Sequence, residues 1–250
     1  MGELFGFCSE APVRWRLTRR PERPGYYREE GWGVAFLDGP AAAILRQAQG
    51  TPDPALAAVL ASPPWQGQSG LAYIRRWTTS PSLANCHPFV REMGGRDWVF
   101  AHNGRLTGLA EAGMRPTVYR PIGSTDSEYA FCTLLSALAE HPDRPPGEHL
   151  DVLRALSTRL ARHGALNYLL ITEASLFAYS SGEYGLRVWQ GEVGSQSQDL
   201  RDEDWEMHLT ADTATPLVVV ATNRMSADGG WRRVRAEELL FAQRGRLAPN

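Results

Sequence analysis

The stretch from Trp98 to Gly104, which reads Trp-Val-Phe-Ala-His-Asn-Gly, holds the residues best suited to chemistry in this chain. Its apolar residues have the composition of a buried strand, and Asn103 and Gly104 follow where that strand is expected to end. A side-chain amide beside an unobstructed backbone N–H supplies the two donors that a developing carbonyl oxyanion requires. The sequence therefore predicts an oxyanion site at Asn103 and Gly104. The alternative, which is the commoner use of this dipeptide, is an Asn-Gly hairpin turn.

Two further positions carry charges that suit an amino-acid ligand. The apolar strand expected over Gly70–Trp77 acquires two adjacent arginines, Arg75 and Arg76. Neighbours on a strand face opposite sides, so one arginine can face a site and hold a carboxylate with its planar fork, although a structural salt bridge explains the pair equally well. Asp126 lies in the first turn of an expected helix, where it either stabilises the helix dipole or faces a cation.

The elements that would position these residues come in the order strands, helices, strands. A capping box formed by Thr125 and Glu128 begins a helix expected over residues 124–140, and a second amphipathic helix is expected over about 148–163. We interpret residues 14–30 and 192–212 as surface segments, and residues 54–62 as a short helix. Strands are expected over residues 3–7, 31–37, 70–77, 98–103, 167–172, 176–180, 186–190, 217–222 and 237–246. This order predicts an α+β fold rather than a doubly wound parallel sheet.

The composition of the chain argues against several classes of protein. With 250 residues and 43% hydrophobic content, one domain is expected. A net charge of -2 without a dense run of basic residues argues against a nucleic-acid partner, and no apolar run reaches the roughly 20 residues of a membrane helix. We therefore expect a cytoplasmic protein. The three cysteines are far apart, so neither a metal site nor a disulfide framework is indicated, and no cofactor is expected.

At this point the chain resembles the class II glutamine amidotransferases, most closely the small stand-alone bacterial type. The resemblance extends over nearly the whole chain, and its motifs are strong together because of their order and spacing. They are Glu3-Leu4-Phe5-Gly6, Gly31-Trp32-Gly33, Ile74-Arg75-Arg76, Asn85-Cys86-His87-Pro88-Phe89, Phe100-Ala101-His102-Asn103-Gly104, Ser124-Thr125-Asp126-Ser127-Glu128 and Ala221-Thr222-Asn223, with Trp231 and Glu237 beyond.

This resemblance implies a four-layer αββα sandwich of the N-terminal nucleophile hydrolase type, formed by residues 1–250 as a single domain. It implies that Asn103 and Gly104 form the oxyanion hole of an amide hydrolase. By the same resemblance, Arg75 binds the α-carboxylate of glutamine, Asp126 binds its α-ammonium, and Thr78 and Thr79 line the pocket. His87 and His102 are expected to be structural, because this chemistry needs no imidazole base.

The chain departs from the family at position 2. Members of the family use a cysteine there, exposed once the initiator methionine is removed, with its own α-amine of pKa about 8 as general base. This chain has Gly2, which cannot form a thioester. Cys8 lies roughly 20 Å further along an extended strand and lacks a free amine, so it is expected to be a buried structural thiol. Either a substitution has been introduced, or a natural relative has lost its nucleophile; the otherwise intact pocket favours an introduced or recent change.

Two functions follow from this pattern. The first is hydrolysis of the side-chain amide of glutamine, or of a γ-glutamyl compound, by a family enzyme that is inactive as written. The second is a glutamine-binding sensor or subunit without catalysis. Because no residues remain for a synthase domain, any ammonia acceptor is expected to be a separate protein.

Overall fold

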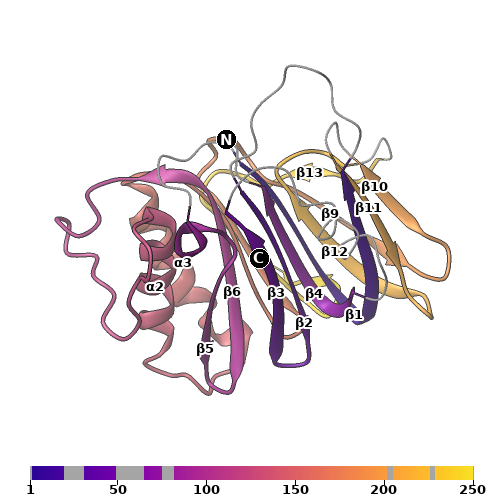
Figure 1. The fold of residues 1–250 in the computed structure, drawn as a ribbon, viewed down its shortest axis with the longest axis horizontal. Helices are drawn as coiled ribbons and strands as arrows, with labels where there is room; N and C mark the ends of the chain where they lie inside the picture. The colour runs from indigo at the N-terminus through magenta and orange to yellow at the C-terminus, as the bar shows by residue number, and fades with distance from the viewer. Residues whose placement is uncertain are drawn as a thin grey trace.

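Two antiparallel β-sheets packed face to face form the centre of the molecule, and two helices cover one of them (Figure 1). The computed structural model describes residues 2–19, 31–48, 65–74, 82–201, 205–225 and 229–249. The helices are α2 (Asp126–Leu138) and α3 (Leu150–Ala161), and both lie against the second sheet, sheet B. The architecture is the α+β sandwich of the N-terminal nucleophile hydrolase type. In the described ranges both helices belong to one outer layer, and the helix expected over residues 54–62 lies outside these ranges.

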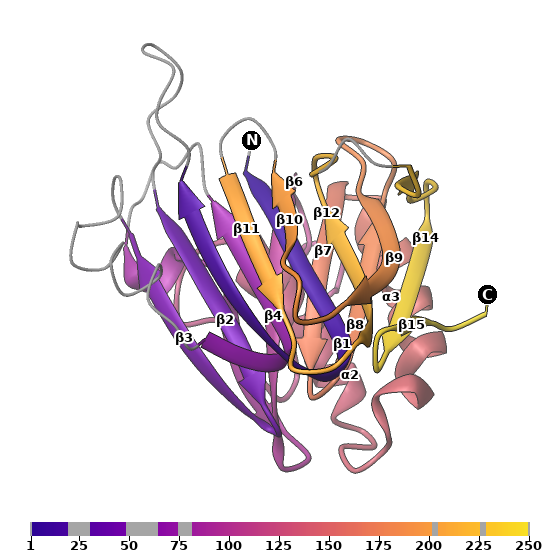
Figure 2. The same ribbon diagram turned by 90° about the vertical axis from the view of Figure 1, so that its right-hand side faces the viewer.

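Sheet A contains nine described strands in the order β13-β9-β12-β1-β4-β2-β3, with β11 also paired to β1 and β10 paired to β11 (Figure 2). Their bounds are β1 Glu3–Arg19, β2 Trp32–Asp38, β3 Ala41–Gln47, β4 Trp65–Ile74, β9 Arg187–Val193, β10 Gln198–Arg201, β11 Trp205–Thr210, β12 Thr215–Ala221 and β13 Arg232–Arg233.

Sheet B contains six described strands in the order β15-β14-β8-β7-β6-β5. Their bounds are β5 Phe89–Met93, β6 Arg96–Leu106, β7 Gly164–Thr172, β8 Ser175–Ser180, β14 Glu238–Gln243 and β15 Arg246–Leu247. Two short 3-10 helices, Leu83–Asn85 and Pro146–His149, precede β5 and α3.

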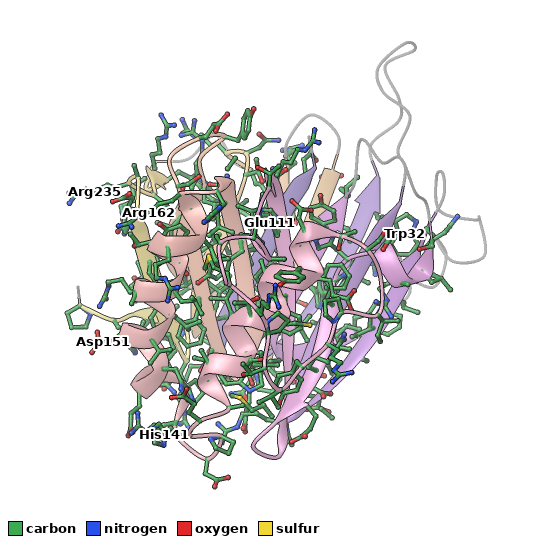
Figure 3. All side chains as sticks on the ribbon, turned by 90° about the vertical axis from the view of Figure 1, so that its left-hand side faces the viewer. Trp32, Glu111, His141, Asp151, Arg162 and Arg235 are labelled. Carbon is green, nitrogen blue, oxygen red and sulfur yellow. The ribbon has the colours of Figure 1, made fainter. Side chains whose placement is uncertain are left out.

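Alternating side chains divide the apolar residues among three cores. Leu4 and Tyr73 of sheet A meet Ala101 of sheet B in the core between the sheets. A second core lies between sheet B and the helices, whose outer surface carries exposed charges such as Asp151 and Arg162 (Figure 3). A third lies on the outer face of sheet A. Gly6 allows the sheets to approach closely, because a Cβ there would lie 2.9 Å from Leu169 Cδ1.

The first strand is much longer than the sequence analysis predicted. We expected a strand over residues 3–7 and a surface segment from residue 14, but β1 continues to Arg19. Its register shifts between Cys8 and Val13, after which residues 14–19 pair with β11. Val13, Trp15 and Leu17 are buried and alternate with more exposed residues. This period of two is the pattern of a half-buried strand, and the arginines between the apolar positions obscured it.

Other boundaries also differ from expectation. The segment 192–212, expected to cross the surface, contains β10 and β11 and is therefore part of sheet A. The helix expected over residues 124–140 is confirmed as α2, while the next begins at Leu150 after a 3-10 turn. β4 begins at Trp65, five residues earlier than predicted. Among the described residues, none of the helices is long and apolar enough to cross a membrane.

Candidate functional site

The backbone of Gly2 and the side chain of Asn103 meet through two hydrogen bonds. Gly2 N donates to Asn103 Oδ1 at 3.2 Å, and Asn103 Nδ2 donates to Gly2 O at 2.8 Å. Both residues are buried. A primary amide carries two N–H donors, so one bond to Gly2 leaves a second N–H of Asn103 for a ligand oxygen.

Asn103 is held in place by the strand that carries it. β6 continues through Asn103 and Gly104 to Leu106, paired with β7, so the strand neither stops at Asn103 nor turns there. Our premise of a strand end was wrong, and so was the alternative of an Asn-Gly hairpin. Asn103 follows Val99 and Ala101 along the face of β6 that packs against sheet A. Asn167 on β7 supports it by donating from Nδ2 to Asn103 O at 3.2 Å.

Gly104 has a conformation and a position that favour glycine. Its φ is +155°, in a region that side-chain-bearing residues rarely adopt. A Cβ there would overlap the Ala165 carbonyl and lie 2.7 Å from His102 Nε2. Absence of a side chain therefore allows β6 and β7 to pair beside Asn103.

His102 connects three elements and has a structural role. Its Nε2 lies 3.1 Å from Ala165 O and its Nδ1 lies 2.9 Å from Ser127 Oγ. A carbonyl only accepts, so Nε2 carries the proton and Nδ1 accepts from the serine hydroxyl. Burial lowers the pKa of His102, although Asp126 and the Ala165 carbonyl act in the opposite direction. The imidazole is therefore neutral at physiological pH.

Asp126 begins α2 and is tied to β6. Its Oδ2 accepts from Leu106 N at 2.6 Å, three positions beyond Asn103. Thr125 caps the helix by accepting from Glu128 N at 3.1 Å, as the capping box predicted. The Glu128 carboxylate, however, does not complete that box: it pairs with Arg91 at 2.6 Å and accepts from Ile122 N and Gly123 N.

Tyr73 lies beside Gly2 and was not among the predicted site residues. It pairs with Leu4 across β1 and β4, and its ring packs against His87 at a centroid distance of 4.3 Å. A Cβ built on Gly2 would lie 2.6 Å from Tyr73 Cζ and still closer to its hydroxyl oxygen. The sequence signal was its place in the expected strand, two positions before Arg75, but only the register of β1 reveals its neighbour.

Two of the sequence motifs, Gly31–Gly33 and Asn85–Phe89, pack against each other close to Tyr73. A Cβ on Gly33 would overlap His87 O and lie 2.7 Å from Pro88 Cδ, so this glycine lets the segment before β5 pack on β2. Cys86 Sγ donates to Trp32 O at 3.4 Å. His87 is buried, in agreement with a structural role.

The remaining predicted residues are outside the described ranges or away from Gly2. Arg75, Thr78 and Thr79 fall in the gap between residues 74 and 82. Cys8 is fully buried, donates from Sγ to Ala174 O at 3.0 Å, and has its pKa raised by burial to about 11. It is the inert structural thiol that we expected. No cluster of three His, Cys, Asp or Glu side chains that could hold a metal occurs among the described residues.

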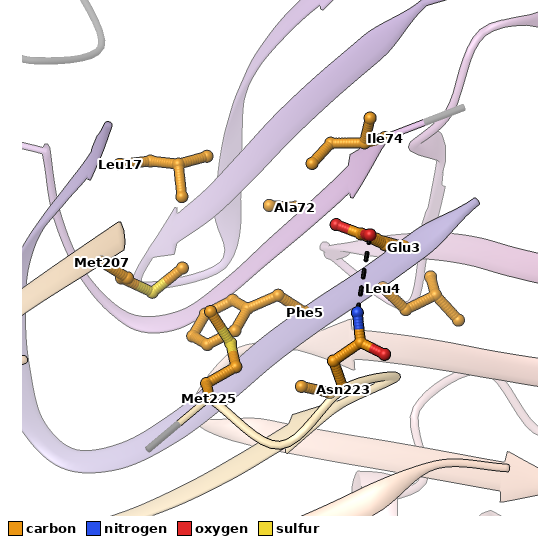
Figure 4. A pocket seen from close by; sticks show the side chains of 10 residues that line it. Glu3, Leu4, Phe5, Leu17, Ala72, Ile74, Met207, Asn223 and Met225 are labelled. Carbon is orange, nitrogen blue, oxygen red and sulfur yellow. Dashed lines mark hydrogen bonds between the residues drawn. The ribbon is translucent and has the colours of Figure 1, made fainter. Parts of the chain in front are cut away.

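A separate, small apolar pocket lies on the outer face of sheet A (Figure 4). Phe5, Met207 and Met225 line it, and Asn223 Nδ2 donates to Glu3 Oε1 at 3.5 Å. Because neighbours on a strand face opposite sides, Glu3 and Phe5 point into this pocket while Gly2 and Leu4 face the core between the sheets. The pocket is therefore on the opposite side of β1 from Asn103.

Known proteins resemble this chain over its full length. The family model described as "Glutamine amidotransferases class-II" matches residues 1–250. The Escherichia coli K12 protein named "Putative glutamine amidotransferase YafJ" is 30% identical over 249 residues, covering 95% of this chain and 96% of YafJ. The protein MJ1515 of Methanocaldococcus jannaschii is 28% identical, covering 99% of this chain and 70% of its own.

Solved structures agree with these sequence matches. The crystal structure of a predicted glutamine amidotransferase from Pseudomonas aeruginosa has a TM-score of 0.79 at 27% identity, covering 99% of this chain and all of its own. Glutamine phosphoribosylpyrophosphate amidotransferase from B. subtilis has a TM-score of 0.60 at 16% identity; this chain matches 48% of it, and the likeness shows a common fold. On the match of its whole length, this chain belongs to the class II glutamine amidotransferases.

Proposed function

We propose that this chain binds the side-chain amide of glutamine, or of a γ-glutamyl compound, in an amidotransferase pocket and does not hydrolyse it. The observation that carries the proposal is the pair of hydrogen bonds between Asn103 and Gly2. The oxyanion donor is held at the position of the nucleophile, but that position has no side chain.

The roles of the pocket residues follow from their chemistry. The free N–H of the Asn103 amide, with the backbone N–H of Gly104, would bind the carbonyl oxygen of the side-chain amide. Arg75 would bind the α-carboxylate through its fork, and Asp126 would accept from the α-ammonium with acceptor positions not used by Leu106 N. Thr78 and Thr79 would complete the pocket wall.

Hydrolysis would need a thiolate at position 2 to attack the amide carbon and form a thioester, with ammonia leaving. Glycine cannot supply it, and the burial and raised pKa of Cys8 exclude that thiol as a replacement. The proposed role is therefore that of a glutamine sensor, or of a subunit beside a separate synthase that would have taken up ammonia in a catalytic relative.

Calorimetric titration with glutamine, glutamate and asparagine tests this proposal, with an ammonia assay on the same samples. We expect saturable binding of glutamine, weaker binding of the other two, and no ammonia above the buffer rate. Asp126→Asn should weaken binding at least tenfold, while Asp151→Asn, an exposed carboxylate on α3, should leave it unchanged. Rapid ammonia release by the unaltered chain, or no binding of glutamine, would contradict the proposal.

A further inference from the structure

The position of the missing nucleophile is filled by another side chain. A Cβ on Gly2 would lie 2.6 Å from Tyr73 Cζ and 2.7 Å from Ile74 O, and nearer still to Tyr73 Oη. Separations under 3.0 Å are essentially never seen for real Cβ atoms. A cysteine at position 2 therefore lacks room for its first side-chain atom in this arrangement.

The ring of Tyr73 is held firmly in this place. It is 6% exposed, and it lies in the core between the sheets with Leu4, its partner across the strand pair. Its ring packs on that of His87, whose ring lies 4.6 Å from that of Phe89, and the His87 carbonyl lies close against Gly33. The contact of the Cβ at position 2 with Ile74 O involves backbone, and it is common to every variant that carries cysteine at this position.

We propose that the side chain of Tyr73 occupies the volume that the side chain of the nucleophile would take. Catalysis is then prevented both by Gly2, which has no thiol, and by Tyr73, which leaves no room for one. This inference rests on the proposed function and deepens it. A single substitution introduced at position 2 would leave a space for the lost side chain, whereas here a buried ring occupies that space. The site belongs to a natural binding protein, and restoring cysteine at position 2 alone does not restore an enzyme.

With a cysteine restored at position 2, hydrolysis of glutamine would pass through a thioester. The thiol of a cysteine at position 2 loses its proton to the free α-amine, and the sulfur forms a bond to the amide carbon of glutamine. The carbon–nitrogen bond then breaks, and ammonia leaves with that proton. Water hydrolyses the thioester to glutamate and returns the thiol.

Three variants test the inference, each after intact-mass confirmation that Met1 is removed: Gly2→Cys, Gly2→Cys/Tyr73→Leu and Gly2→Cys/Tyr73→Phe. Leucine fills the near half of the tyrosine volume and removes the far half that overlaps position 2. Phenylalanine removes only the hydroxyl and keeps the ring carbon 2.6 Å from the Cβ position. We expect ammonia release from glutamine by the leucine variant at least tenfold above the other two. Equal release by Gly2→Cys alone, or none from the leucine variant while it still binds glutamine, would overturn the inference.

A second measurement does not depend on glutamine, and so separates this inference from the proposed function. Overpacking destabilises a buried site, so Gly2→Cys should lower the melting temperature by several degrees beside Tyr73 and by much less in the Tyr73→Leu background. Additive shifts in this double-mutant cycle would overturn the inference even if glutamine proved the wrong ligand. Absence of glutamine binding with strong coupling would reject the proposed function alone.

Discussion

The side-chain amide of Asn103 hydrogen-bonds both polar backbone groups of Gly2, a residue 101 positions away in sequence. These bonds connect β6 of sheet B with the start of β1 in sheet A. The geometry that would preorganise an oxyanion donor therefore also fixes the edge of the core between the sheets. The side chain that we propose as a ligand donor is therefore also a structural contact between the two sheets.

Asn103→Ala should lower the free energy of unfolding by about 1–3 kcal/mol, because the buried N–H and C=O of Gly2 both lose their partner. Urea denaturation measures the change. Asn223→Ala is the matched control, since this exposed amide forms a bond of 3.5 Å to Glu3 and its loss should cost less than about 0.5 kcal/mol. Equal costs for the two variants would show that Asn103 does not hold Gly2 in solution.

Gly104→Ala should be more destabilising than Gly108→Ala. Both glycines have positive φ, +155° and +67°, but only Gly104 has backbone and side-chain atoms where the Cβ would be placed. We expect about 1 kcal/mol for Gly108→Ala and at least about 3 kcal/mol for Gly104→Ala, where overlap adds to the conformational cost. Thermal denaturation of the two variants in parallel gives the comparison, and similar melting temperatures would be the contrary result.

His102 should make the protein less stable in mild acid. Burial lowers its pKa in the folded state below the ordinary 6.5, so below that pH the unfolded chain binds a proton that the folded chain does not. Stability is then lost as pH falls from about 6.5, by at most about 1.4 kcal/mol per pH unit for this group. His102→Gln should flatten the pH dependence of urea denaturation between pH 5 and 7, and an unaltered slope in this variant would contradict the prediction.

The three cysteines should be unreactive in the folded protein. All are buried, and burial raises the pKa of Cys8 and of Cys132 to about 11, so little thiolate forms at neutral pH. We expect alkylation by iodoacetamide to be at least a hundredfold slower than in urea, where all three should react. Rapid native labelling located at Cys8 by peptide mass spectrometry would reopen the question of a second nucleophile.

The sequence predicted the parts of the fold that local patterns determine. The cap at Thr125 placed α2 to within one or two residues, because a capping serine or threonine followed by an amphipathic face is a local signal. The extent of β1 was missed, since arginines mask its period of two and its partner β11 lies almost 200 residues away. The segment forming β10 and β11 was missed because its polar composition suggested a surface crossing, whereas its residues pair along sheet A.

Some residues of the candidate site could be proposed from the sequence, and others are evident only from the structure. Asn103 and Gly104 were proposed as oxyanion donors from their residue types, and β6 runs through them instead of ending there. Tyr73 was missed because its importance comes from the register of two strands, in which it pairs with Leu4 and so reaches Gly2. Glu128 was assigned to the cap alone, while its buried carboxylate pairs with the partly buried Arg91, a contact between elements that no local motif encodes.

The pairing of β1 with β12 has a consequence for how the newly synthesised chain folds. β1 is the central strand of sheet A, yet one of its two edges is completed by residues 217–221, more than 200 positions later. Until those residues have been synthesised, this edge of β1 lacks its partner strand. Folding of sheet A is therefore expected to be slow, as high contact order predicts, and an edge of β1 that is still unpaired can pair with other chains.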